Sequence, residues 1–253
     1  MPIASVGSVH VHYKIDGAGP SLMLVPGTGA DSKVTWGHLV ERFTDSHTVI
    51  RPDFTLEGEL TIEALADQIA AAIEDASTEP ADMVGFSLGA PVVAAVAATR
   101  PALVRRLVLV NGWSRADDPY MQNMMEVWRR SADLGAETFG RLATITAFSP
   151  TFLASLGTEG VEQLISNTEP TTGTLRQIDL NLRLDIRDLL PRIEAETLVI
   201  GCTQDRMVPV SNPRGLHAAI AGSEYAEIDS GHVVLFEQPA EFTKLVRDFL
   251  HRP

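Results

Sequence analysis

Residues 82–99 place one serine between two glycines, at the junction of two apolar segments. The run DMVGF before it is typical of a short buried strand, and the Ala- and Val-rich run after it predicts a helix that Arg100-Pro101 ends. Ser87 therefore lies in a sharp turn from strand to helix. Such a turn projects the hydroxyl away from the backbone but crowds the residues on either side, and glycine at positions 85 and 89 relieves that crowding.

This turn makes Ser87 a candidate nucleophile. A serine hydroxyl reacts slowly until a base removes its proton, so it needs both exposure and a basic partner. The backbone N–H of Leu88 would lie at the N-terminus of the following helix, where it can stabilise a developing oxyanion. Chance alone gives a G-x-S-x-G match about 0.1 times per chain of this composition, so the strand before it and the helix after it carry the prediction.

Strand-like and helix-like segments alternate along most of the chain. This alternation predicts an α/β fold with a mostly parallel sheet covered by helices on both faces. Strands are expected at residues 9–15, 22–25, 47–51, 82–86, 105–111, 197–201 and 224–228, and helices at 36–43, 61–76, 88–99 and 239–251. The alternation stops at residues 113–185, which we interpret as a helical insertion. Residues 1–112 and 186–253 then form the core.

His232 is the candidate base. It follows Ser230-Gly231 in a loop after a predicted strand, and the glycine allows the backbone to aim the imidazole ring. The other six histidines lie in predicted strands, helices or their ends, without chemical groups around them.

A carboxylate is needed to orient the imidazole. Asp205 lies in a short loop after the strand TLVIG and is the preferred candidate. Asp117 and Asp118, which follow the strand LVLV, remain alternatives. Asp229 is too close to His232 in the chain to reach the far side of its ring.

With these residues assigned, the chain resembles the α/β-hydrolase superfamily. Ser87, Asp205 and His232 follow that family's order of nucleophile, acid and base, and the resemblance extends over LMLVPG, the GFSLG turn and the SGH loop. It implies an eight-stranded type of sheet, a helical lid and an oxyanion hole whose second N–H comes from Thr28. The chain has Pro26 where the family usually has His, and DFTLEGEL replaces the family's usual D-x-R-G-x-G-x-S loop.

The insertion at 113–185 would cover the strand ends as a lid. Trp113, Tyr120, Met124 and Trp128 are its candidate substrate-binding residues, and they favour an apolar substrate. The alternative is that such residues only pack the helices of the lid. The polar, Gly-rich segment 157–173 is expected to form a mobile edge of the lid.

Composition limits the partners. A net charge of −13 and an isoelectric point of about 4.9 disfavour binding to nucleic acid or to anionic membranes. The single cysteine, Cys202, permits no intrachain disulfide, and the first residues do not resemble a signal peptide. We therefore expect a cytoplasmic protein, although a secreted protein without disulfides also fits. The sequence leaves the oligomeric state open.

The sequence thus predicts a serine hydrolase that needs neither cofactor nor metal and cleaves an ester, lactone or thioester. Two alternatives keep the same fold. One is a lyase, perhydrolase, acyltransferase or cyclase, and the other is a ligand receptor that retains the three residues without turnover.

Overall fold

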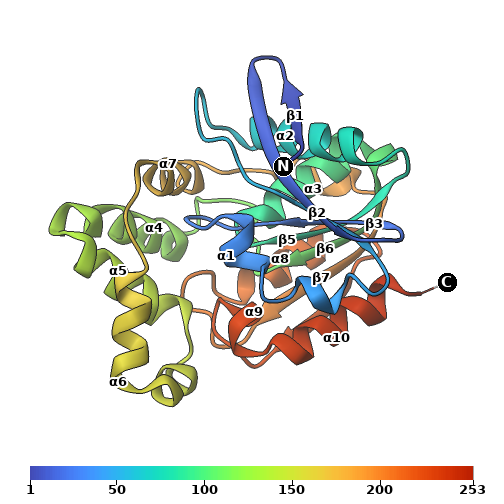
Figure 1. The fold of residues 1–253 in the computed structure, drawn as a ribbon. Helices are drawn as coiled ribbons and strands as arrows, with labels where there is room; N and C mark the ends of the chain where they lie inside the picture. The colour runs from blue at the N-terminus through green and yellow to red at the C-terminus, as the bar shows by residue number, and fades with distance from the viewer. Residues whose placement is uncertain (253) are drawn as a thin grey trace.

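The computed structural model describes residues 1–252, and its centre is an eight-stranded sheet in the order β1-β2-β4-β3-β5-β6-β7-β8 (Figure 1). The pairings of β2 with β1 and with β4 are antiparallel and the other five pairings are parallel, which confirms the predicted mostly parallel sheet. The strands are β1 (Ile3–Val6), β2 (Val9–Gly17), β3 (Ser21–Val25), β4 (Thr48–Pro52), β5 (Ala81–Phe86), β6 (Val104–Val110), β7 (Glu196–Cys202) and β8 (Glu224–Ile228).

Helices cover both faces of the sheet, and each face has its own apolar cluster. The alternating side chains of β3 illustrate this, because Met23 and Val25 join one cluster while Leu22 and Leu24 join the other. The first cluster includes α2 (Ile62–Ala76), α3 (Gly89–Thr99) and α8 (Ser211–Ala219), and the second includes α1 (Ser32–Trp36), α9 (Val234–Glu237) and α10 (Pro239–Leu250).

Residues between β6 and β7 form helices at one side of the sheet (Figure 1). These are α4 (Pro119–Ser131), α5 (Ala136–Ala147), α6 (Pro150–Ser166) and α7 (Thr172–Asn181). The two ends of this segment are joined, since Arg115 and Asp185 form an isolated antiparallel bridge. Two backbone bonds of 2.8 Å flank that bridge, from Ala116 N–H to Leu184 O and from Ile186 N–H to Ser114 O. The segment therefore leaves the sheet and returns to it at one place.

Some boundaries differ from the sequence prediction. The helix expected at 36–43 is instead α1 followed by a 3-10 helix at Val40–Arg42. It starts early because the Asp31 side chain accepts a 2.7 Å bond from Val34 N–H and caps it. Much of segment 157–173 is helical, and Gly157, with φ +66°, interrupts α6. The elements β1, α8 and α9 were not predicted. Within residues 1–252, no helix is both long and apolar enough to cross a bilayer.

Candidate active site

Ser87 lies at the predicted turn, between the end of β5 and the start of α3. Its φ is +53°, a left-handed conformation that is costly for a residue with a side chain. A 2.9 Å bond from Ser87 N–H to Val110 O ties the turn to β6. The neighbouring glycines are needed for space, because a Cβ on Gly85 would lie 2.3 Å from Gly89 O, and one on Gly89 would lie 2.6 Å from Val25 O.

Three side chains that are distant in the sequence meet in one line of hydrogen bonds. The Oγ of Ser87 lies 2.9 Å from Nε2 of His232, and Nδ1 of His232 lies 2.6 Å from Oδ2 of Asp205. All three are buried, with exposed fractions of 6%, 3% and 7% for Ser87, His232 and Asp205. At 2.6 Å the carboxylate can hold the proton on Nδ1, which leaves Nε2 free to accept the hydroxyl proton.

Backbone groups hold the two partners of Ser87 in place. Oδ1 of Asp205 accepts hydrogen bonds from Met207 N–H at 2.9 Å and Val208 N–H at 2.7 Å, so its carboxylate is fixed on both oxygens. Asn111 donates from Nδ2 to the backbone oxygen of His232 at 2.7 Å. Asn111 was not singled out from the sequence. Its φ of +48° at the end of β6 suits an asparagine, but the contact with His232 spans 121 residues.

The other candidate carboxylates are engaged elsewhere. Asp117 is ion-paired with Arg115 at 3.0 Å, and Asp118 caps α4 by accepting a 3.0 Å bond from Met121 N–H. Asp229 accepts hydrogen bonds from the side chains of Thr203 and Gln204. Asp205 is therefore the carboxylate that contacts the His232 ring.

Thr28 and Leu88 lie on the two loops that flank Ser87. The loop that carries Thr28 passes close to the serine, because a Cβ on Gly27 would lie 2.9 Å from Cβ of Ser87. Within residues 1–252, the N–H groups of Thr28 and Leu88 donate to no protein acceptor. Both remain available to an oxygen of a ligand.

Helix α7 fixes the loop of Thr28 with two side-chain amides one turn apart. Nδ2 of Asn181 donates to Oγ1 of Thr28 at 3.0 Å, and Oε1 of Gln177 accepts from Gly29 N–H at 2.8 Å. Both amide side chains are buried, with 1% and 3% exposed. Neither residue was predicted, since nothing in the sequence pairs α7 with a loop about 150 residues earlier.

The four predicted lid residues have different environments. Trp113, Met124 and Trp128 are buried in the apolar cluster, and Trp128 stacks on Phe139 with ring centroids 5.7 Å apart. These contacts support the packing alternative for Trp128. Tyr120 is half-exposed and donates from its hydroxyl to Arg206 O at 2.5 Å. Burial raises the pKa of Tyr120, and the nearby charge of Asp205 adds to this.

The remaining groups to consider near the site are possible metal ligands and the thiol of Cys202. Within residues 1–252, no group of three His, Cys, Asp or Glu side chains is arranged to hold a metal ion. Cys202 ends β7 in the core, and burial raises the pKa of its thiol well above the usual range. Its sulfur accepts a 3.2 Å hydrogen bond from Nδ2 of Asn111. A buried thiol with a raised pKa is a poor nucleophile.

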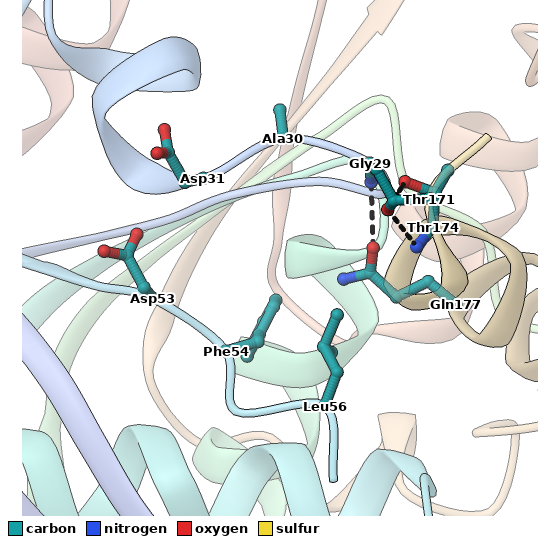
Figure 2. Close-up of a pocket in the computed structure, with 9 residues that line it drawn as sticks. All are labelled: Gly29, Ala30, Asp31, Asp53, Phe54, Leu56, Thr171, Thr174 and Gln177. Atoms are coloured by element: carbon teal, nitrogen blue, oxygen red, sulfur yellow. Dashed lines mark hydrogen bonds between the residues drawn. The ribbon is translucent and has the colours of Figure 1, made fainter. Parts of the chain in front are cut away.

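A cavity of about 190 Å³ opens beside the loop of Thr28 (Figure 2). Three segments form its wall, namely that loop, the loop after β4 and the start of α7. The lining residues are Gly29, Ala30, Asp31, Asp53, Phe54, Leu56, Thr171, Thr174 and Gln177.

Comparison with known proteins finds relatives over nearly the whole chain. A model of the alpha/beta hydrolase family matches residues 22–245. The chain is 40% identical to pyrrolizixenacetamide deacetylase of Xenorhabdus hominickii, over 97% of this chain and 96% of the relative. It is 28% identical to a putative carbamate hydrolase, RutD, of Azorhizobium caulinodans, over 98% of both chains. Among solved structures, the enol-lactonase of Burkholderia xenovorans LB400 superposes with a TM-score of 0.85 at 25% identity, covering 99% of this chain and 100% of that one.

Proposed function

The chain belongs to the alpha/beta hydrolase family, and from this premise we propose that it is a cofactor-free serine hydrolase of an apolar small molecule. The bond it cleaves is a carboxylic ester, lactone or thioester. The observation that carries the proposal is the hydrogen-bond line from Ser87 Oγ through the imidazole of His232 to Asp205.

In the first half of the proposed reaction, Nε2 of His232 takes the proton of Ser87 while Oγ attacks the substrate carbonyl carbon. Asp205 holds the imidazole in the required tautomer and stabilises its positive charge. The tetrahedral intermediate collapses when His232 passes the proton to the leaving group. The product of this half-reaction is an ester between Ser87 and the acyl group.

In the second half, a water molecule takes the place of the leaving group. His232 removes a proton from this water, the hydroxide attacks the acyl-enzyme, and the proton returns to Ser87 Oγ as the acid leaves. In both halves, the N–H groups of Thr28 and Leu88 would donate to the carbonyl oxygen as it becomes negative.

We assign residues 113–185 as the lid and residues 1–112 and 186–253 as the core. The support is the closed base of the insertion at Arg115 and Asp185 together with the deep burial of Ser87. Apolar lid residues would exclude water and accept an apolar part of the substrate. Trp113, Tyr120, Met124 and Trp128 remain candidates for this contact.

A second candidate reaction is removal of an acyl group from an amide nitrogen. It is favoured by the relative with 40% identity, which is named pyrrolizixenacetamide deacetylase. Amide cleavage uses the same residues, but His232 must protonate the leaving nitrogen before the C–N bond breaks. Parallel assays of an acetate ester and the matching acetamide distinguish the two reactions.

The test combines turnover with labelling. We expect 4-nitrophenyl acetate to give a burst of 4-nitrophenol, and we expect a fluorophosphonate to label wild-type protein but not Ser87→Ala. Labelling of Ser87 without hydrolysis of any ester, lactone, thioester or amide would favour a lyase, perhydrolase, acyltransferase or cyclase, or a ligand receptor. Absence of both labelling and turnover would contradict a nucleophilic role for Ser87.

A further inference from the structure

The cavity beside the loop of Thr28 is lined by a side-chain amide whose nitrogen has no protein partner in the described part of the chain. Gln177 is 3% exposed, and its Oε1 accepts from Gly29 N–H, yet its Nε2 donates to no protein acceptor within residues 1–252. Figure 2 shows this nitrogen directed into the cavity, above Phe54 and Leu56. Because this N–H opens to the cavity and none of the described residues accepts from it, it is free to donate to a ligand oxygen or to water.

The opposite side of the cavity carries two negative charges. The carboxylates of Asp31 and Asp53 lie there in Figure 2, and each uses only one oxygen for the protein, on Val34 N–H and Ser32 N–H. In the part of the chain that the structure describes, neither forms an ion pair. Arg176 forms no ion pair with them within residues 1–252, and its guanidinium donates to the backbone oxygens of Leu56 and Gly58.

The cavity and the proposed nucleophile both border the loop of Thr28. Gly27 packs against Cβ of Ser87, and Gly29, two residues later, lines the cavity. Two Cα–Cα steps span at most about 7.6 Å. A substrate whose carbonyl lies at Ser87 would need a side group of several atoms, directed along this loop, to place a charge in the cavity.

We propose that this cavity is a subsite for a positively charged amine on the substrate. The amine donates to the free oxygens of Asp31 and Asp53, the ring of Phe54 offers a further attractive surface for a cation, and Gln177 Nε2 binds an oxygen of the same ligand. Asp31 and Asp53 repel an anionic group here. The inference rests on the proposed hydrolase function and adds to it a charge requirement away from the scissile bond.

The test uses three chromogenic esters that share one leaving group. These are 4-nitrophenyl 6-aminohexanoate, 4-nitrophenyl heptanoate and the mono-4-nitrophenyl ester of adipic acid, whose acyl ends are positive, neutral and negative. A second set, the acetates of 4-(aminomethyl)phenol, 4-ethylphenol and 4-(carboxymethyl)phenol, places the same charges on the leaving group. In at least one set we expect kcat/KM to favour the cation over the neutral ester by about tenfold and to disfavour the anion.

Variants assign the preference to the cavity. Asp31→Asn and Asp53→Asn keep an oxygen for the backbone N–H that each aspartate caps, and each should lower the cation-to-neutral ratio by about threefold. Asp133→Asn removes an exposed charge that does not line the cavity and should leave the ratio unchanged. Equal kcat/KM for the three charges in both sets, or equal loss of the ratio in Asp133→Asn, would overturn the inference.

Binding to Ser87→Ala separates this inference from the proposed reaction. Calorimetry measures the affinity of that variant for the cationic and neutral esters of both sets, which it cannot consume by acylation. If wild-type protein hydrolyses no ester, the proposed function fails. The subsite would still be supported if Ser87→Ala binds the cationic ester more tightly than the neutral one, and if this difference is smaller in the Ser87→Ala, Asp53→Asn double variant. Equal affinity for cation and neutral ester in both sets would overturn the subsite.

Discussion

Nδ2 of Asn181, at the end of α7, donates a 3.0 Å hydrogen bond to Oγ1 of Thr28, which precedes it by 153 residues. Thr28 belongs to the loop that passes Ser87, and Asn181 belongs to the helical segment between β6 and β7. The position of the proposed oxyanion donor therefore depends on a helix of the segment between β6 and β7. Because Gln177 holds Gly29 one turn earlier, displacement of α7 would release two consecutive residues of this loop.

This contact predicts a positioning role for Asn181. Asn181→Leu removes the amide with little change in volume, and Thr28→Val removes the hydroxyl but keeps the backbone N–H. We expect each to lower kcat by about tenfold, with a smaller change in KM, because the oxyanion acquires its charge only as the reaction proceeds. Steady-state kinetics on 4-nitrophenyl acetate measures both parameters.

The double variant tests whether the two side chains act together. If the hydrogen bond positions the donor, the double variant should be no slower than the slower single variant, since the second change finds the bond already broken. Multiplicative losses would show that the two residues act independently. Chemical denaturation of all three proteins identifies any loss that comes from unfolding.

The carboxylate of Asp205 predicts a large and specific loss of activity. Asp205→Asn places an amide against Nδ1 of His232, which no longer favours the tautomer with a free Nε2, and kcat should fall by about 10³- to 10⁴-fold. Ser87→Ala and His232→Ala should fall at least as far. Asp118→Asn is the matched control, because asparagine also caps α4 and kcat should stay within twofold. Unchanged activity in Asp205→Asn would exclude Asp205 as the orienting acid.

The local features of this site were predictable from the sequence. The turn at Ser87 depends on residues 82–99 alone, because strand, glycines and helix are contiguous and each has a distinct pattern. Asp205 and His232 could be proposed from loops that follow predicted strands, since the carboxyl ends of parallel strands meet at one edge of the sheet. The alternation of strands and helices similarly predicted the sheet and its two covered faces.

Contacts across the molecule were not predictable in the same way. Asn111, Gln177 and Asn181 act through partners more than 100 residues away, and a polar residue in a helix usually indicates only a solvated face. The helix α1 was misplaced because its start depends on the Asp31 cap rather than on apolar spacing. Segment 157–173 was expected to form a mobile edge of the lid, and its glycines did not reveal that much of it is helical, with a break at Gly157.

Gly85 is predicted to be intolerant of any side chain. A methyl group there would lie 2.3 Å from Gly89 O and 2.6 Å from Cγ2 of Val93, and the backbone oxygen cannot move without distorting the turn of Ser87. We expect Gly85→Ala to lower the free energy of unfolding by about 3 kcal/mol or more. Gly215→Ala is the control, because Gly215 lies in α8 with no atom within 4 Å of the new methyl group, and it should be neutral or stabilising. Urea denaturation compares them, and equal stabilities would contradict the steric argument.

Cys202 is predicted to be unreactive in the folded protein. Burial raises the pKa of its thiol, so the reactive thiolate is scarce at neutral pH, and the side chain is out of reach of solvent. We expect no reaction with Ellman's reagent in buffer and one equivalent of thiol in guanidinium chloride. Esterase activity should persist after incubation with iodoacetamide. Rapid labelling of the native protein would show that β7 opens far more readily than its packing indicates.

His47 predicts a loss of stability in acid that is separate from catalysis. Burial lowers the pKa of His47 to about 4, and the positive charges of His251 and Arg105 add to this effect. The unfolded chain binds a proton at its ordinary pKa of about 6.5, whereas the folded protein does not, so protonation favours unfolding as the pH falls from about 6.5 to about 4. Between pH 7 and pH 5 this residue should lower the free energy of unfolding by about 2 kcal/mol.

Urea denaturation at both pH values measures this effect. The free energy of unfolding should decrease less for His47→Asn than for wild-type protein, while His12→Asn, which changes an exposed histidine on β2, should follow wild type. An equal decrease in His47→Asn would assign the acid sensitivity to other groups.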